Sequence, residues 1–145
     1  EPTSSVFSVK DSGETNNNNQ TYIAYLFAGK QGYSKFGSYV GNGNADGTFV
    51  YTGFKPAWVV VKQSSAAGEG WYMWDNKRDV FNAATNFLTI NTVAAQGAGV
   101  DMDMVSNGFK HRYSGAASNS AATYIYWAFA ENPFVTSTGV PATAR

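Results

Sequence analysis

Two nearly identical segments, TYIAYLFA (Thr21–Ala28) and TYIYWAFA (Thr123–Ala130), lie 102 positions apart in this chain. The match extends backwards, since residues 7–28 and 109–130 share nine identical positions of 22, including residues of the polar loop before each segment. Both segments are rich in aromatic and β-branched residues, which favour strands. The identical positions are apolar strand residues and turn residues, so the repeat predicts a structural role for them and not a chemical one.

A repeat with a period near 100 residues is typical of a tandem array. We therefore interpret residues 1–30 as the closing β-ribbon of a preceding unit. Residues 31–134 are then one complete unit, and residues 135–145 form a C-terminal tail. The chain is expected to be a slice of a longer array.

A lone two-stranded ribbon is only marginally stable in water. The first ribbon is therefore expected to dock on the domain or on a neighbour, by adding to a sheet and burying apolar side chains. Its deletion is expected to give an aggregating or unfolded product. The predicted assembly residues are Tyr22, Ile23, Tyr25 and Phe27.

The remainder of the chain also has the pattern of a β protein. Hydrophobic residues make up 43% of the chain and charged residues 14%, and 15 glycines mark frequent turns. About ten short strand candidates alternate with Gly/Asn turns, and Asn107-Gly108 is a strong hairpin signal. Helical spacing occurs only at Val80, Ala83, Ala84 and Phe87. The sequence predicts an all-β fold, an antiparallel β-sandwich of jelly-roll or concanavalin-like type, with at most one short helix.

Charge and composition exclude several classes of function. Ten acids balance ten bases and no Lys/Arg cluster is present, so we expect no nucleic-acid partner. No apolar run reaches the roughly 20 residues needed to cross a bilayer, so we expect no membrane insertion. The chain has no cysteine, which excludes disulfides and thiolate ligands. No cofactor and no metal site is predicted.

Several segments carry a resemblance to a known family. The run from YSKFGSYVGNG to GFKPAWVVVK, together with WYMWDNKRD, SNGFKHR and TYIYWAFAENPF, resembles the tandem C-terminal units of tail-fibre-like structural proteins of tailed bacteriophages. The resemblance covers nearly the whole chain in order. It implies a virion component, in the tail or at the surface and thus extracellular, in a family mostly without an assigned activity.

The stretch WYMWDNKRD concentrates aromatic and charged residues at the end of a predicted strand. Alternation would place Trp71, Met73 and Asp75 on one face of that strand and the intervening aromatics on the other. One face is expected to be core, and the other could stack on sugar rings. Packing against the core or a subunit is the alternative. The candidate ligand-binding residues are Trp71, Tyr72, Trp74, Lys77 and Arg78.

Other polar residues are candidates for catalytic or metal-binding groups. Asp101 and Asp103 share one strand face and could form a glycosidase pair with an acid such as Asp75, but simple alternation also explains their spacing. His111, the single histidine, lies between two cations and is read as a solvated strand residue. The loop Asn42–Gly47 lacks the closing Glu of a calcium loop and is read as a turn. No catalytic residue is assigned, and we expect the chain not to be an enzyme.

The function expected from the sequence is that of a virion structural module of a phage tail or fibre. It would serve assembly and, as a further role, attachment to host-surface glycans. The expected partners are a homo-oligomer or neighbouring repeat units, and a host glycan. Two alternatives are a glycan-degrading enzyme domain and a pure self-assembly element that uses β-strand addition.

Overall fold

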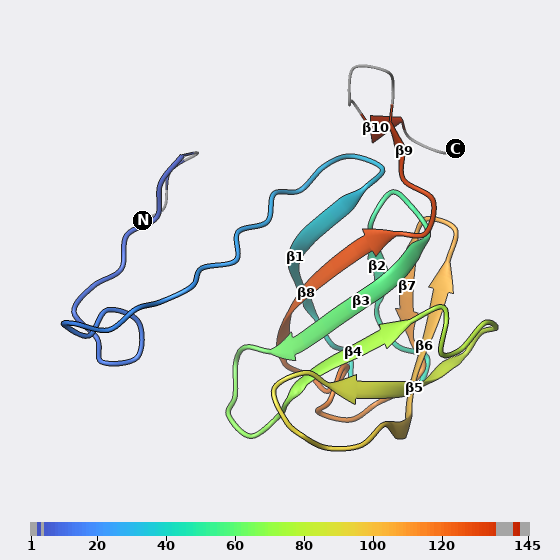
Figure 1. Ribbon diagram of the computed structural model, residues 1–145. Coiled ribbons are helices and arrows are strands. Elements are labelled where there is room, and N and C mark those ends of the chain that lie inside the picture. The colour runs from blue at the N-terminus through green and yellow to red at the C-terminus, as the bar shows by residue number, and fades with distance from the viewer. Residues whose placement is uncertain (1–2, 4, 136–140, 143–145) are drawn as a thin grey trace.

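The computed structural model describes residue 3, residues 5–135 and residues 141–142 (Figure 1). These residues form strands, turns and extended segments and contain no helix, so the all-β prediction is confirmed. Within the same residues there is accordingly no helix that could cross a membrane. The strands are β1 (Ser34–Val40), β2 (Phe49–Tyr51), β3 (Pro56–Gln63), β4 (Trp71–Asp75), β5 (Ala84–Thr89), β6 (Gly97–Val105), β7 (Gly108–His111), β8 (Thr123–Ala130), β9 (Phe134–Val135) and β10 (Pro141–Ala142).

Eight strands form one antiparallel sheet in the order β1-β8-β3-β4-β5-β6-β7-β2, and β9 pairs with β10 separately. The large sheet curls until its two edge strands approach each other, so it is nearly closed into a barrel (Figure 1). Lys35 Nζ on β1 donates to the Tyr51 carbonyl on β2 at 2.8 Å, and Thr48 Oγ1 donates to the Val40 carbonyl at 2.9 Å. The predicted two-sheet sandwich is not confirmed, because the eight strands belong to a single continuous sheet.

The core fills the inside of the curled sheet. Alternate residues of each strand point inward, as the strand period of two requires. Trp74 on β4 is fully buried, and its indole Nε1 donates to the Val100 carbonyl on β6, two strands away, at 2.9 Å. Tyr39 stacks on Tyr124 with ring centroids 5.1 Å apart. The apolar core consists of Tyr39, Val50, Phe54, Val59, Val61, Trp74, Ala84, Val100, Met102, Met104, Phe109, Ala117, Tyr124, Tyr126 and Ala128.

The alternating pattern and the turn signals of the second half are reproduced. Met102 and Met104 on β6 are 0% and 5% exposed and belong to the core. The turn at Asn107 joins β6 to β7, with Val105 paired to Gly108, as the Asn-Gly signal predicted. Pro56 stands at the first position of β3, where the ladder to β8 has a register shift.

The short helix that the sequence allowed at Val80, Ala83, Ala84 and Phe87 does not form. Residues 80–83 bend, and Ala84 begins strand β5. Hydrogen bonds to other segments account for the difference. The Asp79 carboxylate accepts from the backbone N and the side-chain Nδ2 of Asn86, both at 2.7 Å. Asn82 exchanges two hydrogen bonds with the backbone of Met104 on β6. These contacts across the sheet outweigh a weak local preference for helix.

Residues 5–29, here called the arm, do not form the predicted strands. The arm runs away from the sheet (blue in Figure 1), and directly after it Lys30 forms an isolated bridge with Ser34. Ile23 and Tyr25 are 78% and 80% exposed. The arm therefore adds no strand to the sheet of its own chain. Docking on a neighbour stays a prediction.

Candidate assembly surface

The arm keeps the local structure of the loop and strand that it repeats. In the domain, the Tyr124 hydroxyl donates to the Ala116 carbonyl at 2.9 Å and accepts from Ser120 N at 3.0 Å. In the arm, the aligned Tyr22 hydroxyl donates to the Gly13 carbonyl at 3.2 Å and accepts from Asn17 N at 2.9 Å.

Gly13 and Asn17 align with positions 115 and 119, one residue before the atoms that Tyr124 contacts. A tyrosine therefore closes the loop before the strand in both copies. In the arm the strand that follows has no sheet around it.

One side chain of the arm contacts the domain through its ring. Phe27, the equivalent of Phe129, lies with its ring centroid 5.9 Å from each of the rings of Phe36, Trp127 and Phe129. The chain then reverses in a short turn. There Ser34 Oγ donates to the Ala28 carbonyl at 3.0 Å, and backbone bonds link Lys30 with Ser34 in both directions. This turn fixes where the arm leaves β1.

Phe27 contacts an apolar surface on the outside of the sheet, over β1, β8, β3 and β4. The registers place Phe36 beside Trp127, Trp127 beside Val60, and Trp58 beside Phe129. Val60 is 1% exposed although it points outward, because the larger side chains around it cover it. Antiparallel sheets commonly present polar residues on the face away from the core, and this face departs from that pattern. We call it the outer aromatic face: Phe36, Trp58, Val60, Trp71, Met73, Ile125, Trp127 and Phe129.

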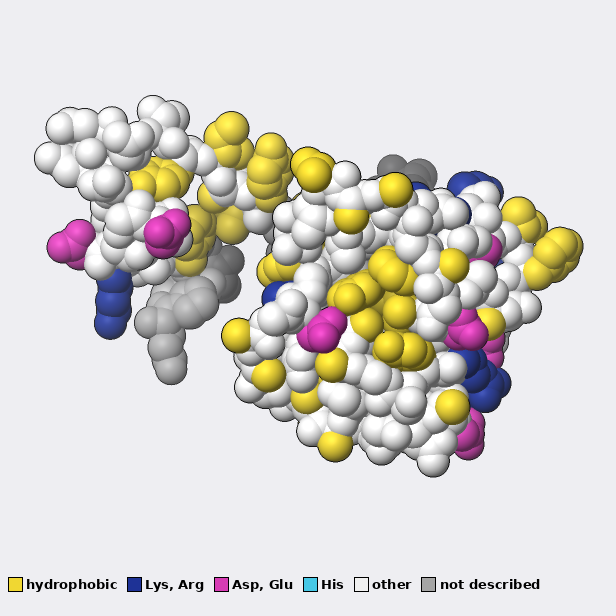
Figure 2. Space-filling model, turned by 90° about the horizontal axis from the view of Figure 1, so that it is seen from below, with side chains coloured by type: hydrophobic (Ala, Val, Ile, Leu, Met, Phe, Trp, Pro, Cys, Tyr) yellow, Lys and Arg dark blue, Asp and Glu magenta, His cyan; other side chains and the backbone are white. Residues whose placement is uncertain are grey.

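The arm and the outer aromatic face together form one apolar region. In Figure 2 the arm stands out from the body of the domain, and hydrophobic side chains (yellow) line the part that joins it. Leu26 in this part is 73% exposed. Exposed apolar surface that is continuous over several elements is typical of an interaction site.

The predicted assembly residues differ in their surroundings. Phe27 is 56% exposed and touches the outer aromatic face, Tyr22 closes the arm's loop, and Ile23 and Tyr25 point into solvent. The sequence did not identify the outer aromatic face as a site. Its signal was present, because TYIYWAFA and AWVVVK are apolar at both odd and even positions.

The structure does not bring the five candidate ligand-binding residues together. Trp71 lies on the outer aromatic face, with its ring centroid 5.2 Å from that of Trp127. Tyr72 and Trp74 point inward, where their rings stack at 6.1 Å. Trp74 is 0% exposed, so its indole cannot contact a sugar. Lys77 is exposed, and Arg78 forms an ion pair with Asp75 at 3.1 Å.

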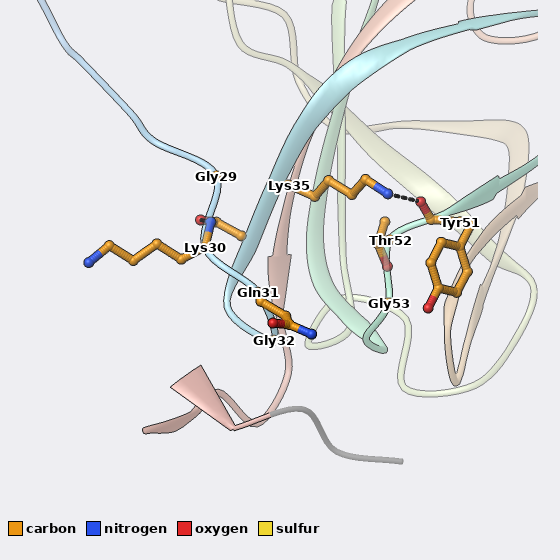
Figure 3. Close-up of a pocket in the computed structure, with 9 residues that line it drawn as sticks. Gly29, Lys30, Gln31, Gly32, Lys35, Tyr51, Thr52 and Gly53 are labelled. Carbon is orange, nitrogen blue, oxygen red and sulfur yellow. Dashed lines mark hydrogen bonds between the residues drawn. The ribbon is translucent and has the colours of Figure 1, made fainter. Parts of the chain in front are cut away.

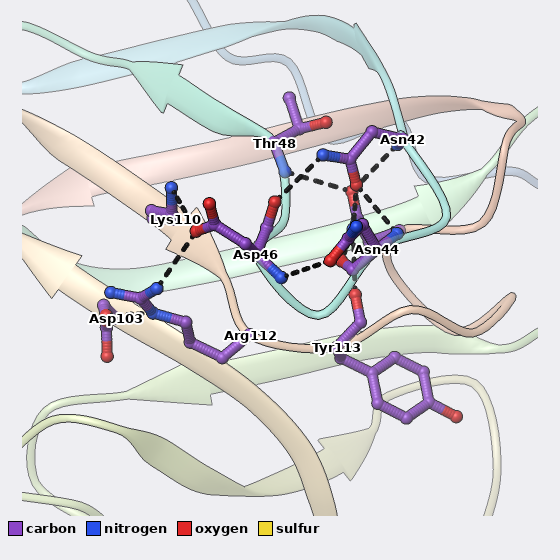
Figure 4. A network of polar contacts seen from close by, with 9 residues as sticks. Asn42, Asn44, Asp46, Thr48, Asp103, Lys110, Arg112 and Tyr113 are labelled. Carbon is purple, nitrogen blue, oxygen red and sulfur yellow. Dashed lines mark hydrogen bonds and ion pairs between the residues drawn. The ribbon is translucent and has the colours of Figure 1, made fainter.

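The loop Asn42–Gly47 is a turn, as expected, and a buried amide holds it in place (Figure 4). Asn119, fully buried, donates from Nδ2 to Asn42 Oδ1 at 2.8 Å and to the Asn44 carbonyl at 2.9 Å. A Cβ at position 47 would lie 2.7 Å from that Nδ2 atom, so only glycine fits. Asn17 aligns with Asn119, so the arm carries the same amide without such a loop beside it.

Charged residues next to this loop neutralise one another (Figure 4). Asp46 pairs with Lys110 at 2.8 Å and Arg112 at 3.3 Å, and the hydrogen bond from Lys110 lowers the pKa of the Asp46 carboxyl. Arg112 also pairs with Asp103 at 2.6 Å, which raises the pKa of the guanidinium. These exposed pairs orient the loop and β7 and contribute little stability.

Two of the three acids that could form a glycosidase pair are held by separate cations, whereas Asp101 forms no ion pair among the described residues and its Oδ1 atom is buried without a hydrogen-bond partner. Asp103 on β6 pairs with Arg112, whereas Asp75 at the end of β4 pairs with Arg78. Among the described residues, no group of three or more His, Asp or Glu side chains could hold a metal ion.

His111 is not the solvated residue that the sequence suggested. It is 0% exposed and stacks on Tyr39 with ring centroids 5.0 Å apart, because β7 turns it into the core. Burial lowers the pKa of its imidazole from 6.5 to about 3.

A shallow pocket lies at the seam between β1 and β2 (Figure 3). Lys35 crosses the seam to the Tyr51 carbonyl, and its Nζ lies 5.0 Å from the centroid of the Tyr51 ring. Lys30 points away from the seam in Figure 3. The lysine side chain acts here as a strut between the two edges of the sheet.

Fold and surface together define an all-β protein with a nearly closed sheet, an apolar outer face and an exposed apolar arm. The chain belongs to the family described as Domain of unknown function (DUF7483), whose model matches residues 1–133. The matched range includes the arm as well as the sheet. Neither a curated protein nor a solved structure matches the chain.

Proposed function

We propose that this chain is a structural module for assembly. Residues 31–134 form one unit, and the arm is the closing ribbon of a neighbouring unit of the same kind. The observation that carries the proposal is that the hydroxyl groups of Tyr22 and Tyr124 make equivalent contacts in the two copies of the repeat. Tyr22 closes its loop as Tyr124 does, yet the strand after it lies exposed. A segment that keeps the loop and the apolar pattern of β8 without a sheet is suited to complete the sheet of another unit.

The resemblance of the sequence to tail-fibre-like phage proteins supports placing this module in the tail or fibre of a virion, outside the cell. The balanced charge also favours assembly, because neighbouring copies would meet without net repulsion. The proposal assigns no catalytic step to the chain.

An extended chain tests whether the arm completes a unit. Residues 31–108, which contain β1 to β6, are placed directly before Phe7, as Gly108 directly precedes Phe109. The arm then follows β6 in the register of β7 and β8. We expect the backbone amides of residues 21–28 to exchange with solvent roughly a hundredfold more slowly than in the 145-residue chain, because they would join a ladder.

The inward positions of the arm differ from those of β8, since Ala24 and Leu26 align with Tyr126 and Ala128. A second extended chain carries Ala24→Tyr and Leu26→Ala and so has the residues of β8 at these two inward positions. It serves as a control in case the natural arm residues pack poorly inside the sheet. Amides of residues 21–28 that exchange equally fast in both extended chains and in the 145-residue chain would refute the proposal.

A further inference from the structure

We infer that the outer aromatic face is the surface on which a second unit of this kind docks. In the isolated chain this partner is a second copy, and the two outer aromatic faces meet with the arms extending the contact. This inference rests on the proposed function and adds to it the surface that joins the units. The same surface patch would serve both partners, as a two-fold contact requires.

The first argument is that the arm, which repeats part of the unit, already contacts the face through one residue. Phe27 and Phe129 hold the same place in the repeat, and their rings lie 5.9 Å apart edge to face. The strand end of one unit therefore rests on the strand end of the next. Alternation along the arm puts Ile23 and Tyr25 on the same side as Phe27, so the apolar row continues beyond the contact.

The second argument is that the described aromatic contacts of the arm reach only one part of the face, from Phe27 to Phe36, Trp127 and Phe129. Ile23 and Tyr25 point into solvent, and no described aromatic contact joins the arm to Trp58 or Trp71. Those tryptophans lie on β3 and β4, beyond the Phe27 contact. Tryptophan and phenylalanine at the centre of a surface patch are the residues that carry most binding energy in protein interfaces.

The third argument concerns charge. The strands under the face carry two charged residues that point outward, Lys62 and Asp75. Lys62 Nζ donates to the Gln63 carbonyl at 2.8 Å, and Asp75 pairs with Arg78. Covering the face therefore desolvates one charge without an ion-pair partner among the described residues, that of Lys62, and its ammonium keeps the hydrogen bond to a carbonyl, which limits the cost.

The test uses the 145-residue chain and its own tryptophans. Three of the four tryptophans, Trp58, Trp71 and Trp127, lie on the outer aromatic face, whereas Trp74 is fully buried. Sedimentation velocity from micromolar to millimolar chain is expected to show a monomer–dimer equilibrium. Quenching of tryptophan emission by acrylamide is expected to fall as the dimer forms.

Two variants locate the contact. Tyr25→Ser changes an arm residue that is 80% exposed and leaves the fold alone, and it is expected to weaken the dimer roughly tenfold. Phe36→Ser, on the face itself, is expected to weaken it at least as much, with near-ultraviolet circular dichroism confirming the fold. Phe81→Ser is the matched control, because Phe81 is 84% exposed in the turn before β5 and is expected to leave the dimer unchanged.

The outcomes separate this inference from the function on which it rests. A chain that stays monomeric at every concentration would overturn the inference, even if the extended chain protects residues 21–28 and upholds the proposed function. A dimer that Phe81→Ser weakens and Tyr25→Ser does not would also overturn it. The inference would also be overturned if the chain stayed monomeric and its tryptophan emission changed on adding lipopolysaccharide. That result would assign the face to glycan binding.

Discussion

His111 is buried by the curled sheet, although the sequence predicted a solvated residue at this position. In the described structure neither imidazole nitrogen has a hydrogen-bond partner, and the ring lies between Tyr39 and Phe109. A charged imidazole there would be neither solvated nor paired, which explains the lowered pKa. The sequence could not predict this burial, because Lys110 and Arg112 on either side are surface residues and β7 is too short to show clear alternation.

The lowered pKa of His111 predicts a loss of stability in mild acid. The unfolded chain binds the proton at about its ordinary pKa of 6.5, whereas the folded chain resists it down to about 3. The contribution of neutral His111 is therefore complete above pH 6.5 and is lost as the pH falls toward 3. At pH 4.5 the cost is about 2 to 3 kcal/mol, from roughly 1.4 kcal/mol for each pKa unit.

Urea unfolding of the chain and of His111→Val, at neutral pH and at pH 4.5, measures this cost. Valine is the residue that the repeat carries at position 9, which aligns with 111. The variant is expected to lose less stability than the chain itself between the two pH values, since all other groups titrate in both. Parallel losses in the two proteins would show that His111 is not the responsible group.

Asn119 shows what the repeat could reveal at the level of a single side chain. Its identity with Asn17 marked it as a structural position before any contact was known. The structure adds the reason, which is the set of hydrogen bonds that hold the loop Asn42–Gly47. Those partners lie more than 70 positions away in the chain, so no local pattern could name them.

Strands with clear alternation were predictable, and segments decided by distant contacts were not. The Asp/Met alternation and the Asn-Gly turn located β6, β7 and the hairpin between them. The same reasoning assigned strands to the arm, which has the composition of strands but in the described structure pairs with no strand. Composition describes what a segment can form, while pairing depends on what lies beside it.

Deletion of the arm is expected to leave the domain folded, in contrast to the expectation from the sequence. The eight-stranded sheet is complete without the arm, whose described aromatic contacts with it all run through the half-exposed ring of Phe27. Together these contacts are worth about 1 kcal/mol, so the melting temperature of the truncated chain should fall by no more than about 8 °C. Differential scanning calorimetry measures the change.

Phe27→Ala in the full chain is the control for this deletion, and it is expected to lower the melting temperature by nearly as much. A truncated chain that is unfolded or aggregates would contradict the structure and restore the original expectation. A stable truncated chain would show that the arm serves a neighbour and not the stability of its own unit.

The all-β class followed from composition and alternation, whereas the number of sheets did not. Both a sandwich and a curled single sheet place alternate residues inside. The difference lies in whether strands on opposite walls are joined through a continuous ladder, and here β4, β5 and β6 supply that link. Strand pairing of this kind connects residues through long loops, and it leaves no periodic signal in the sequence.

The remaining gap in the barrel, between β1 and β2, is expected to be its most easily opened part. Lys35 spans it through the Tyr51 carbonyl, and β2 is three residues long. Lys35→Met removes this strut but keeps an unbranched side chain to cover the seam. Because an exposed contact of this kind contributes less than about 1 kcal/mol, the free energy of unfolding should barely change. Amides of residues 49–53 should nevertheless exchange faster, while those of β3 and β8, which pair with a strand on each side, stay protected. Lys55→Met removes an ion pair with Glu131 away from the seam and is the matched control. If both variants exchange alike at residues 49–53, the two edges are held by the core alone, and the lysine strut has no part in closing the sheet.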